Sequence, residues 1–205
     1  MVFGLGSSLL WKSLYTVSCS TGYAYEKADK KLKKYLWNEV IGKCFSDDEE
    51  TKSALLPLAL CLIGENRFEN VYIWQGSGSN GKSLLQFLVM QTFGDGDMGS
   101  GYAGKLDANY LMTSKDNGKS ADPMMAGKKN CRAVFVSELP KDAQYNEAKI
   151  NMMVGRDPVP TRPLYKAQIN IKPKFIPFLS TNYRMMLDGG MYSTIRRYKL
   201  FNYIW

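Results

Sequence analysis

The stretch "YIWQGSGSNGKSLL", which runs from Tyr72 to Leu85, joins a short apolar segment to a loop rich in glycine, serine and asparagine. In this loop Gly76 is followed, after four residues, by the triplet Gly-Lys-Ser, which is the spacing of a phosphate-binding loop. The apolar run Val71 to Trp74 is typical of a buried strand, whereas the long unbranched residues after the loop favour a helix. We therefore predict that the loop connects a strand to the N-terminus of a helix.

A loop at this position has the chemistry to bind a nucleotide. Backbone N–H groups and the helix dipole attract an anion there, and glycines allow positive φ angles and close approach to phosphate. Lys82 would contact the β- and γ-phosphates, and the Ser83 hydroxyl would bind Mg²⁺. We expect Lys82 to be exposed when no nucleotide is bound. A glycine turn with a chance lysine is the alternative, which the flanking strand and helix disfavour. The residues predicted to bind ATP or another NTP are Gly76, Ser77, Gly78, Ser79, Asn80, Gly81, Lys82, Ser83 and Leu84.

Composition indicates an intracellular protein with no membrane partner. With 205 residues, of which 45% are hydrophobic, the chain can bury one core and a small second module. No segment reaches the roughly 20 apolar residues that span a bilayer. The apolar run from Ala54 is half that length and contains Pro57, so we interpret it as a buried helix. The N-terminus lacks the basic start and the cleavage site of a secretory signal.

Cysteine spacing and the absence of histidine exclude several kinds of site. The sequence has no histidine, so histidine-based catalysis is excluded, and the wide cysteine spacing excludes zinc fingers and any obvious disulfide framework. Reduced thiols are the remaining interpretation for Cys19, Cys44, Cys61 and Cys131.

The chain divides into three parts. Residues 1–22 are rich in glycine and serine and are predicted to form an arm or linker. Residues 23–68 have the pattern of a small helical module. In residues 69–205 strands and helices alternate, which predicts an α/β fold with a mostly parallel sheet and helices on its faces.

Local signals define the helical module and one polar loop. The first helix is predicted over "EKADKKLKKYLWNEVIGKCF" and the second through Ile63. The second begins at "SDDEE", where Ser46 and Glu49 fit a capping box. In the polar, glycine-rich loop after the phosphate-binding region, Asp95 and Asp97 resemble a metal-binding pair, but a solvated turn is the favoured interpretation. That loop is too polar for the core and contains one short helix at "DANYLM".

Hydrolysis requires further groups, and the ends of two later strands supply candidates. The strand "AVFV" is followed by Ser137 and Glu138, and the strand "FIPFLS" is followed by Thr181 and Asn182. Because the carboxyl ends of parallel strands meet at one edge of a sheet, we expect these side chains to lie together near the phosphate-binding loop. Glu138 would act on Mg²⁺ or the attacking water, and Asn182 would contact the γ-phosphate.

An arginine pair and a basic segment complete the list of candidates. Arg196 and Arg197 are suited to stabilise negative charge that develops during hydrolysis. The net charge of +8 favours a polyanionic partner, and a proline-interrupted segment that ends in the alternating pattern "YKAQINI" predicts a projecting hairpin. Its cations would contact DNA phosphates and its tyrosine would stack on a base, unless the tyrosine packs inward. The predicted DNA-binding residues are Arg156, Arg162, Tyr165, Lys166 and Lys172.

Five blocks of the chain resemble, in order, the motifs of superfamily 3 helicases, specifically the primase-helicases of poxviruses, giant viruses and related phages. The blocks are "YIWQGSGSNGKSLL", "AVFVSELP", "NEAKINMMVGRDPVPTRPLY", "KPKFIPFLSTN" and "DGGMYSTIRRYKLFNY". The resemblance extends from about Thr21 to the last residue. It implies a P-loop NTPase domain of the AAA+-like type that uses Mg²⁺ and ATP, forms a homo-hexameric ring and moves along single-stranded or forked DNA.

The resemblance also implies roles for particular residues. Gly76–Ser83 would be the Walker A motif, Glu138 the Walker B acid and Asn182 the sensor. Gly155–Tyr165 is similar to the segment that leads into the DNA-contacting loop. Arg196 or Arg197 would be the finger that reaches a neighbouring subunit's nucleotide. A primase and a polymerase would be partners at the replication fork, in the host cytoplasm or nucleus.

Two features depart from the family pattern and keep alternatives open. Ser137 stands where many ATPases have the first of two adjacent acids, so Mg²⁺ would be held mainly by Ser83, phosphates and water. The chain is short and has no recognisable primase domain, so we expect a fragment or a reduced version. A P-loop kinase, another P-loop NTPase, or a nucleotide- and DNA-binding module without helicase activity are the alternatives.

Overall fold

A five-stranded sheet forms the centre of the computed structural model, which describes residues 19–97, 100–112, 122–142, 144–185 and 195–204. All neighbouring strands are parallel, in the order β2-β3-β6-β1-β7. The predicted α/β fold of the P-loop NTPase type is confirmed. The strands are β1 (Val71–Gln75), β2 (Ala103–Leu106), β3 (Ala133–Leu139), β6 (Ile176–Thr181) and β7 (Tyr198–Asn202).

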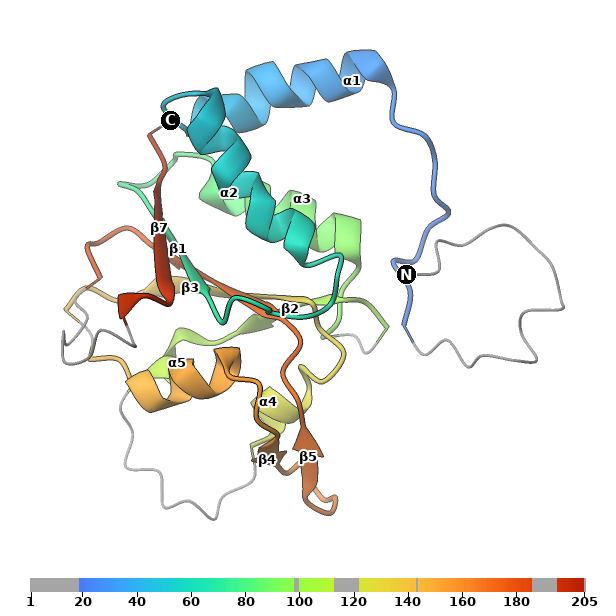
Figure 1. Cartoon of the computed structure of the whole chain (residues 1–205), viewed down its shortest axis with the longest axis vertical. Helices are drawn as coiled ribbons and strands as arrows, with labels where there is room; N and C mark the ends of the chain where they lie inside the picture. The colour runs from blue at the N-terminus through green and yellow to red at the C-terminus, as the bar shows by residue number, and fades with distance from the viewer. Residues whose placement is uncertain (1–18, 98–99, 113–121, 143, 186–194, 205) are drawn as a thin grey trace, which may run out of the picture.

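Helices cover both faces of this sheet (Figure 1). The helices α2 (Asp48–Leu60) and α3 (Lys82–Phe93) lie on one face, and η4 (Ala108–Leu111), α4 (Pro123–Ala126) and α5 (Glu147–Val154) lie on the other. Strands that are buried on both faces have nearly continuous apolar sequences, as "VYIW" and "AVFV" do here. No helix in the described residues combines the length and the hydropathy needed to cross a membrane.

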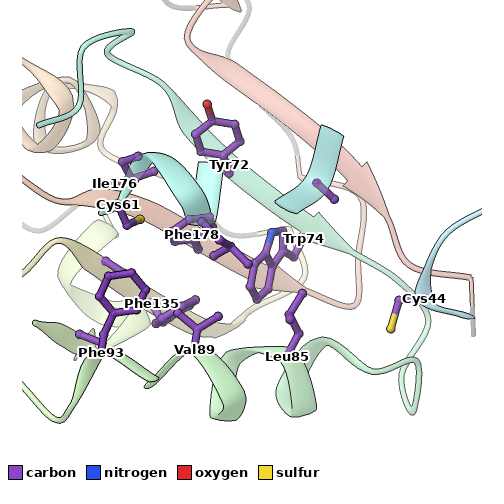
Figure 2. Packing of buried hydrophobic residues seen from close by; sticks show 14 of the residues in the cluster. Cys44, Cys61, Tyr72, Trp74, Leu85, Val89, Phe93, Phe135, Ile176 and Phe178 are labelled. Carbon is purple, nitrogen blue, oxygen red and sulfur yellow. The ribbon is translucent and has the colours of Figure 1, made fainter. Parts of the chain in front are cut away.

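An aromatic cluster joins the sheet to α3 and thereby fixes the helix that follows the phosphate-binding loop. Trp74, Phe135 and Phe178 come from three adjacent strands, and their ring centroids are 5.2–5.6 Å apart. Leu85 and Val89 of α3 pack against the same cluster (Figure 2). Edge-to-face and offset aromatic contacts of this kind add to the stabilisation from burial.

The segment predicted to be a helical module contains helices that differ in detail from the predicted ones. Its first helix is α1 (Lys30–Tyr35), which continues as a π-helical turn, η2 (Leu36–Ile41), and a 3₁₀ turn, η3 (Gly42–Cys44). Residues of η3 and α2 belong to the same apolar cluster as Trp74, so this module shares a core with the sheet. None of the four cysteines forms a disulfide, as predicted, and all four are buried.

The predicted cap of α2 was wrong by one residue. Asp47, and not Ser46, is the N-cap, because its carboxylate accepts a hydrogen bond from the Glu50 backbone N–H at 2.8 Å. The residue three positions after the cap is therefore Glu50 rather than Glu49. The Glu50 carboxylate accepts hydrogen bonds from the backbone N–H and the hydroxyl of Ser46, at 3.0 and 2.6 Å.

Strand β2 was missed in the segment that the sequence indicated to be a polar surface loop. It lies at the edge of the five-stranded sheet beside β3, its Ala103 also forms a bridge with Asp95, and its Ala103 and Leu106 are buried. A Cβ atom on Gly104 would lie 2.9 Å from Asp97 Oδ1 and 3.0 Å from Cys131 Sγ, so a larger residue there would require these side chains to move. The short length of β2 and its glycine gave no strand pattern in the sequence. The short helix predicted at "DANYLM" is present as η4.

Candidate nucleotide site and DNA-binding hairpin

The phosphate-binding loop has the backbone conformation that its glycines permit. Gly78 and Gly81 have φ angles of 105° and 86°, in the region that side chains disfavour. A Cβ atom on Gly76 would lie 1.9 Å from Asn80 Nδ2 and 2.7 Å from the Tyr203 carbonyl oxygen, so only glycine fits there. The loop ends at Gly81, the residue before the first turn of α3.

Lys82 is buried, which corrects the expectation that it is exposed without nucleotide. Only 7% of Lys82 is exposed, and its ammonium group donates hydrogen bonds to the Gly76 carbonyl at 2.8 Å and to Asn80 Oδ1 at 2.7 Å. The lysine thus bends back into its own loop, because neutral oxygens there are within reach. Within the described part of the chain it forms no ion pair with a carboxylate. Desolvation lowers the pKa of Lys82 below its usual value.

A hydrogen bond to a residue distant in the sequence holds the phosphate-binding loop in place. Asn80 is 2% exposed, and its side-chain amide donates a hydrogen bond of 3.1 Å to the carbonyl of Tyr203, directly after β7. Tyr203 in turn donates its backbone N–H to Gln75, at the end of β1. Sequence reasoning assigned Asn80 to nucleotide binding alone and gave no signal for this structural contact.

The expected convergence of strand ends is confirmed by the register of the sheet. Gln75 of β1 pairs with Thr181 of β6, and Thr181 pairs with Leu139 of β3. The phosphate-binding loop, Glu138 and Asn182 therefore lie along one edge of the sheet, at its carboxyl ends. Ser83 at the start of α3, Glu138 and Asn182 are all exposed, so solvent or a ligand can reach them.

Glu138 was predicted to follow the strand, but it lies in a β-bulge within the strand. Strand β3 continues to Leu139, and its register with β6 shifts between Val136 and Leu139, which leaves one extra residue on β3. Glu138 has a φ of 60°, which is uncommon for a residue with a side chain. The Ser137 hydroxyl donates a 2.8 Å hydrogen bond to Gln86 Oε1 of α3. The bulge thus ties Ser137 to the helix after the phosphate-binding loop and leaves Glu138 exposed.

A pocket of about 350 Å³ opens beside Glu138. Its other polar lining comes mainly from the end of β2 and from η4, in particular Lys105, Asp107 and Asn109. Sequence reasoning missed these residues because β2 was not predicted. Asp107 caps η4 by accepting a hydrogen bond from the Asn109 backbone N–H at 2.7 Å.

Thr181, at the end of β6, and the following Asn182 have different environments. Thr181 is 3% exposed, and its hydroxyl accepts a 3.0 Å hydrogen bond from the backbone N–H of Tyr183. This contact fixes the turn after β6 that presents Asn182. Asn182 is exposed at the same sheet edge as the phosphate-binding loop.

The arginine pair lies at the opposite end of the sheet. Both arginines precede β7 in a turn, and the register of β7 with β1 puts them beside the amino end of β1. Arg197 pairs with Glu69 at 2.9 Å and donates a 3.2 Å hydrogen bond to Asn151, whereas Arg196 is exposed. Within one chain, the pair is therefore not brought together with the phosphate-binding loop.

The projecting hairpin is confirmed. Strands β4 (Val159–Thr161) and β5 (Ile169–Ile171) pair in antiparallel fashion on the α4 side of the sheet (Figure 1). Tyr165 at its tip is fully exposed, so the inward-packed alternative is wrong. Arg162, Lys166 and Lys172 are also exposed, and we call these three residues the hairpin cations.

Arg156 lies before the hairpin and has structural partners. Its side chain is 3.5 Å from the Glu69 carboxylate and donates a hydrogen bond to the Arg67 carbonyl. Glu69 thus contacts both Arg156 and Arg197. Arg156 thus contacts described residues outside the hairpin, whereas Arg162 donates a 3.3 Å hydrogen bond to the Lys166 carbonyl within it.

Asp95 and Asp97 lie in a solvated turn, which was the interpretation that the sequence favoured. Asp97 contacts Lys128 and accepts a 2.8 Å hydrogen bond from the Lys105 backbone N–H, while Asp95 accepts one of 2.9 Å from the Asp97 backbone N–H. In the described ranges, no group of three or more potential metal ligands occurs.

Comparison with known proteins relates this chain to viral proteins. It is 31% identical over 189 residues to a putative helicase of Acanthamoeba polyphaga mimivirus, which covers 92% of this chain and 19% of that protein. It is 30% identical over 135 residues to a putative helicase of Frog virus 3, covering 64% and 13%. It is 26% identical over 125 residues to a putative primase of African swine fever virus, covering 61% and 12%. No protein-family model matches the chain.

A solved structure has the same fold. The apo C-terminal region of NrS-1 matches with a TM-score of 0.53 and 17% identity, over 88% of this chain and 38% of that one. A second structure of that region gives a TM-score of 0.55 at 16% identity. The chain therefore spans less than a fifth of the length of the viral relatives and about two fifths of the solved structure.

Proposed function

We propose that this chain, which is homologous to viral proteins named as helicases and primases, is the ATPase part of a DNA helicase or translocase. Its substrates would be ATP, or another NTP, and DNA in single-stranded or forked form. The proposed reaction is hydrolysis of the β–γ phosphate bond, coupled to movement along DNA. The observation that carries the proposal is the shared sheet edge of the phosphate-binding loop, Glu138 and Asn182.

The loop fits a nucleotide in its charge as well as in its shape. A buried ammonium group with only neutral oxygen partners lacks a compensating negative charge, and a triphosphate would supply it. On binding, Lys82 would exchange the Gly76 carbonyl and the Asn80 amide for phosphate oxygens. The glycines leave the backbone N–H groups of the loop accessible to the same phosphates.

Ser83 and Glu138 are the residues that would act on Mg²⁺. The bound ion would neutralise phosphate charge and act as a Lewis acid. Ser83 is exposed in the first turn of α3 and would hold the ion through its hydroxyl. Because Ser137 is tied to Gln86 and is uncharged, Glu138 supplies the only carboxylate of this motif. Its exposure beside an open pocket suits a residue that orients the attacking water.

Arg196 is the candidate finger, and it would act on a neighbouring subunit. Arg197 is held by Glu69 and Asn151, whereas Arg196 is exposed. Both lie at the far end of the sheet from their own phosphate-binding loop, so an arginine finger requires a second copy of the chain. A closed ring of six copies, as the family resemblance implies, would place an arginine at each junction. Primase and polymerase partners remain predictions from that resemblance.

The hairpin would contact DNA without reading its sequence. Exposed cations attract phosphates, and a fully exposed tyrosine presents both ring faces for stacking on a base. In a ring, several such hairpins would act on one strand, so each contact can be weak. We place the protein inside infected host cells on the basis of its viral relatives.

Steady-state hydrolysis with and without single-stranded DNA tests this function. We expect NTP turnover that rises when DNA is added, and a large loss of turnover in Glu138→Gln with nucleotide binding retained. A P-loop kinase would be indifferent to DNA. Nucleotide binding without turnover, even with DNA present, would support a binding module, which Ser137 in the Walker B position favours as the second candidate.

A further inference from the structure

Helix α1 is a basic element whose charge the fold does not use. Five lysines occur between residues 27 and 34, and four of them are in the six residues of α1. All residues from 22 to 35 are exposed, and α1 contributes no buried side chain. None of the five forms an ion pair with another described residue. We call them the α1 lysines: Lys27, Lys30, Lys31, Lys33 and Lys34.

Local electrostatics oppose this helix. Lys30 lies one turn from Lys33 and Lys34, and Lys31 lies one turn from Lys34, and each like-charged pair costs about 0.2–0.5 kcal/mol. The first turn has no acidic residue, so Lys30 and Lys31 face the positive end of the helix dipole, whereas Lys33 and Lys34 lie in the last turn, where the dipole favours cations. The Asp29 cap, which accepts N–H groups at 3.2 and 3.3 Å, is the local compensation. A polyanion bound along α1 would remove the repulsion.

We propose that the α1 lysines form a second nucleic-acid-binding site that contacts the phosphate backbone without reading sequence. The inference rests on the proposed function for its choice of polyanion. Charge complementarity carries it, since five unpaired cations in eight residues exceed what solubility requires. Exposed Tyr35 at the end of α1 adds an aromatic ring to the cations, as in single-strand binding surfaces.

The position of α1 indicates which part of the DNA it would contact. Helix α1 lies with α2 and α3 on one side of the sheet, and the hairpin lies beyond α4 on the other side (Figure 1). The same few nucleotides cannot contact both. The α1 site would therefore bind a different stretch, such as the duplex or the displaced strand of a fork. A membrane surface fits less well, because α1 has six residues and exposes only one aliphatic side chain, Leu32.

The test compares two variants that each remove four positive charges. In the α1 variant, Lys30, Lys31, Lys33 and Lys34 become glutamine, which keeps good helix propensity. In the control variant, exposed lysines outside α1 and the hairpin become glutamine: Lys52, Lys129, Lys141 and Lys199. Fluorescence anisotropy with a forked DNA, at several salt concentrations, gives the affinity and its salt dependence. Thermal unfolding checks that both variants fold.

We expect the α1 variant to bind the fork at least about 5-fold more weakly at 0.1 M salt, with a slope of log K against log salt that is flatter by up to about 3. The control variant should stay within about 2-fold of the unaltered chain, because its charges are dispersed. Equal affinity and slope for the α1 and control variants would overturn the proposal. Lysine-dependent binding to vesicles containing phosphatidylserine, with no loss of fork binding, would overturn it in favour of a membrane.

Substitution of the hairpin cations separates failure of this inference from failure of the proposed function. If that substitution weakens fork binding and the α1 variant does not, only the second site is wrong. If neither variant weakens binding and DNA leaves hydrolysis unchanged, the proposed function itself is wrong.

Discussion

Replacement of Lys82 tests whether the buried ammonium group has both a structural and a catalytic role. Its two hydrogen bonds, 2.8 and 2.7 Å long, join a charged donor to neutral oxygens in a loop that is largely closed to solvent. Hydrogen bonds to charged groups contribute about 1.5–3 kcal/mol each, and the desolvation that lowers the pKa of Lys82 offsets part of that. We expect Lys82→Ala to lower the free energy of unfolding by about 1–3 kcal/mol.

Thermal unfolding without nucleotide measures this cost. For a chain of this length, 1 kcal/mol corresponds to about 2–4 °C in Tm, so the expected decrease is roughly 2–12 °C. Lys82→Met is the matched control, because it keeps the length and apolar volume of the side chain and removes only the ammonium group. A similar decrease in both variants assigns the cost to the hydrogen bonds, and a decrease in alanine alone assigns it to packing.

The pH dependence of stability gives an independent check. The folded-state pKa of Lys82 is below its unfolded value of 10.5, so the unfolded chain binds more protons in the window between the two values. The free energy of unfolding should therefore rise with pH through that alkaline window. Lys82→Met should lack this pH dependence, because methionine does not titrate. Hydrolysis should be lost in both variants. Unaltered Tm and unaltered turnover in either variant would refute the reasoning about this loop.

The other predictions concern Glu138, the hairpin cations and the ion pairs of Glu69. Glu138→Gln should retain nucleotide affinity and slow hydrolysis by about 10²-fold or more, measured by single-turnover assays; lost affinity would mean a metal-binding or structural role. Alanine at the hairpin cations should weaken DNA binding equally across sequences and flatten its salt slope by up to about one unit per lost contact, with nucleotide affinity unchanged. Glu69→Gln should lower the free energy of unfolding by about 1–3 kcal/mol, because Arg156 and Arg197 lose their shared carboxylate. Glu65→Gln, which removes the exposed ion pair with Arg67, should lower it by less than about 1 kcal/mol. Equal losses in these two variants would contradict the structural role of Glu69.

The central part of the fold could be predicted because its signals are local. The apolar run at Val71 to Trp74, the glycine spacing and the helix after Lys82 are all contained in one short stretch. The convergence of Glu138 and Asn182 on that loop followed from the general geometry of parallel sheets. The exposed tip of the hairpin followed from prolines and alternation.

Features that depend on distant contacts could not be predicted. The burial of Lys82 requires Asn80, and Asn80 is oriented by Tyr203, which is 123 residues away. The bulge at Glu138 depends on how β3 pairs with β6, and no local signal marks it. The sequence does not distinguish Arg196 from Arg197, because the contacts of Arg197 with Glu69 and Asn151 come from distant parts of the chain.

If two subunits complete each ATPase site, a mixture of two inactive variants should recover hydrolysis. Lys82→Ala keeps a good arginine, and Arg196→Ala keeps a good phosphate-binding loop. An arginine finger contributes about 10³-fold or more to the rate and little to nucleotide binding in the ground state. Each variant alone should therefore be inactive, and Arg196→Ala should still bind nucleotide. Arg197→Ala should mainly lose stability, because that residue pairs with Glu69.

The most direct measurement is the steady-state hydrolysis of NTP by an equal mixture of Lys82→Ala and Arg196→Ala, after subunit exchange has been verified. Random assembly in a closed ring puts an intact loop against an intact arginine at about one junction in four. We predict that the mixture recovers activity up to about a quarter of that of the unaltered protein, whereas the separate variants remain inactive. Verified exchange with no recovery at any mixing ratio would contradict an ATPase site shared between subunits.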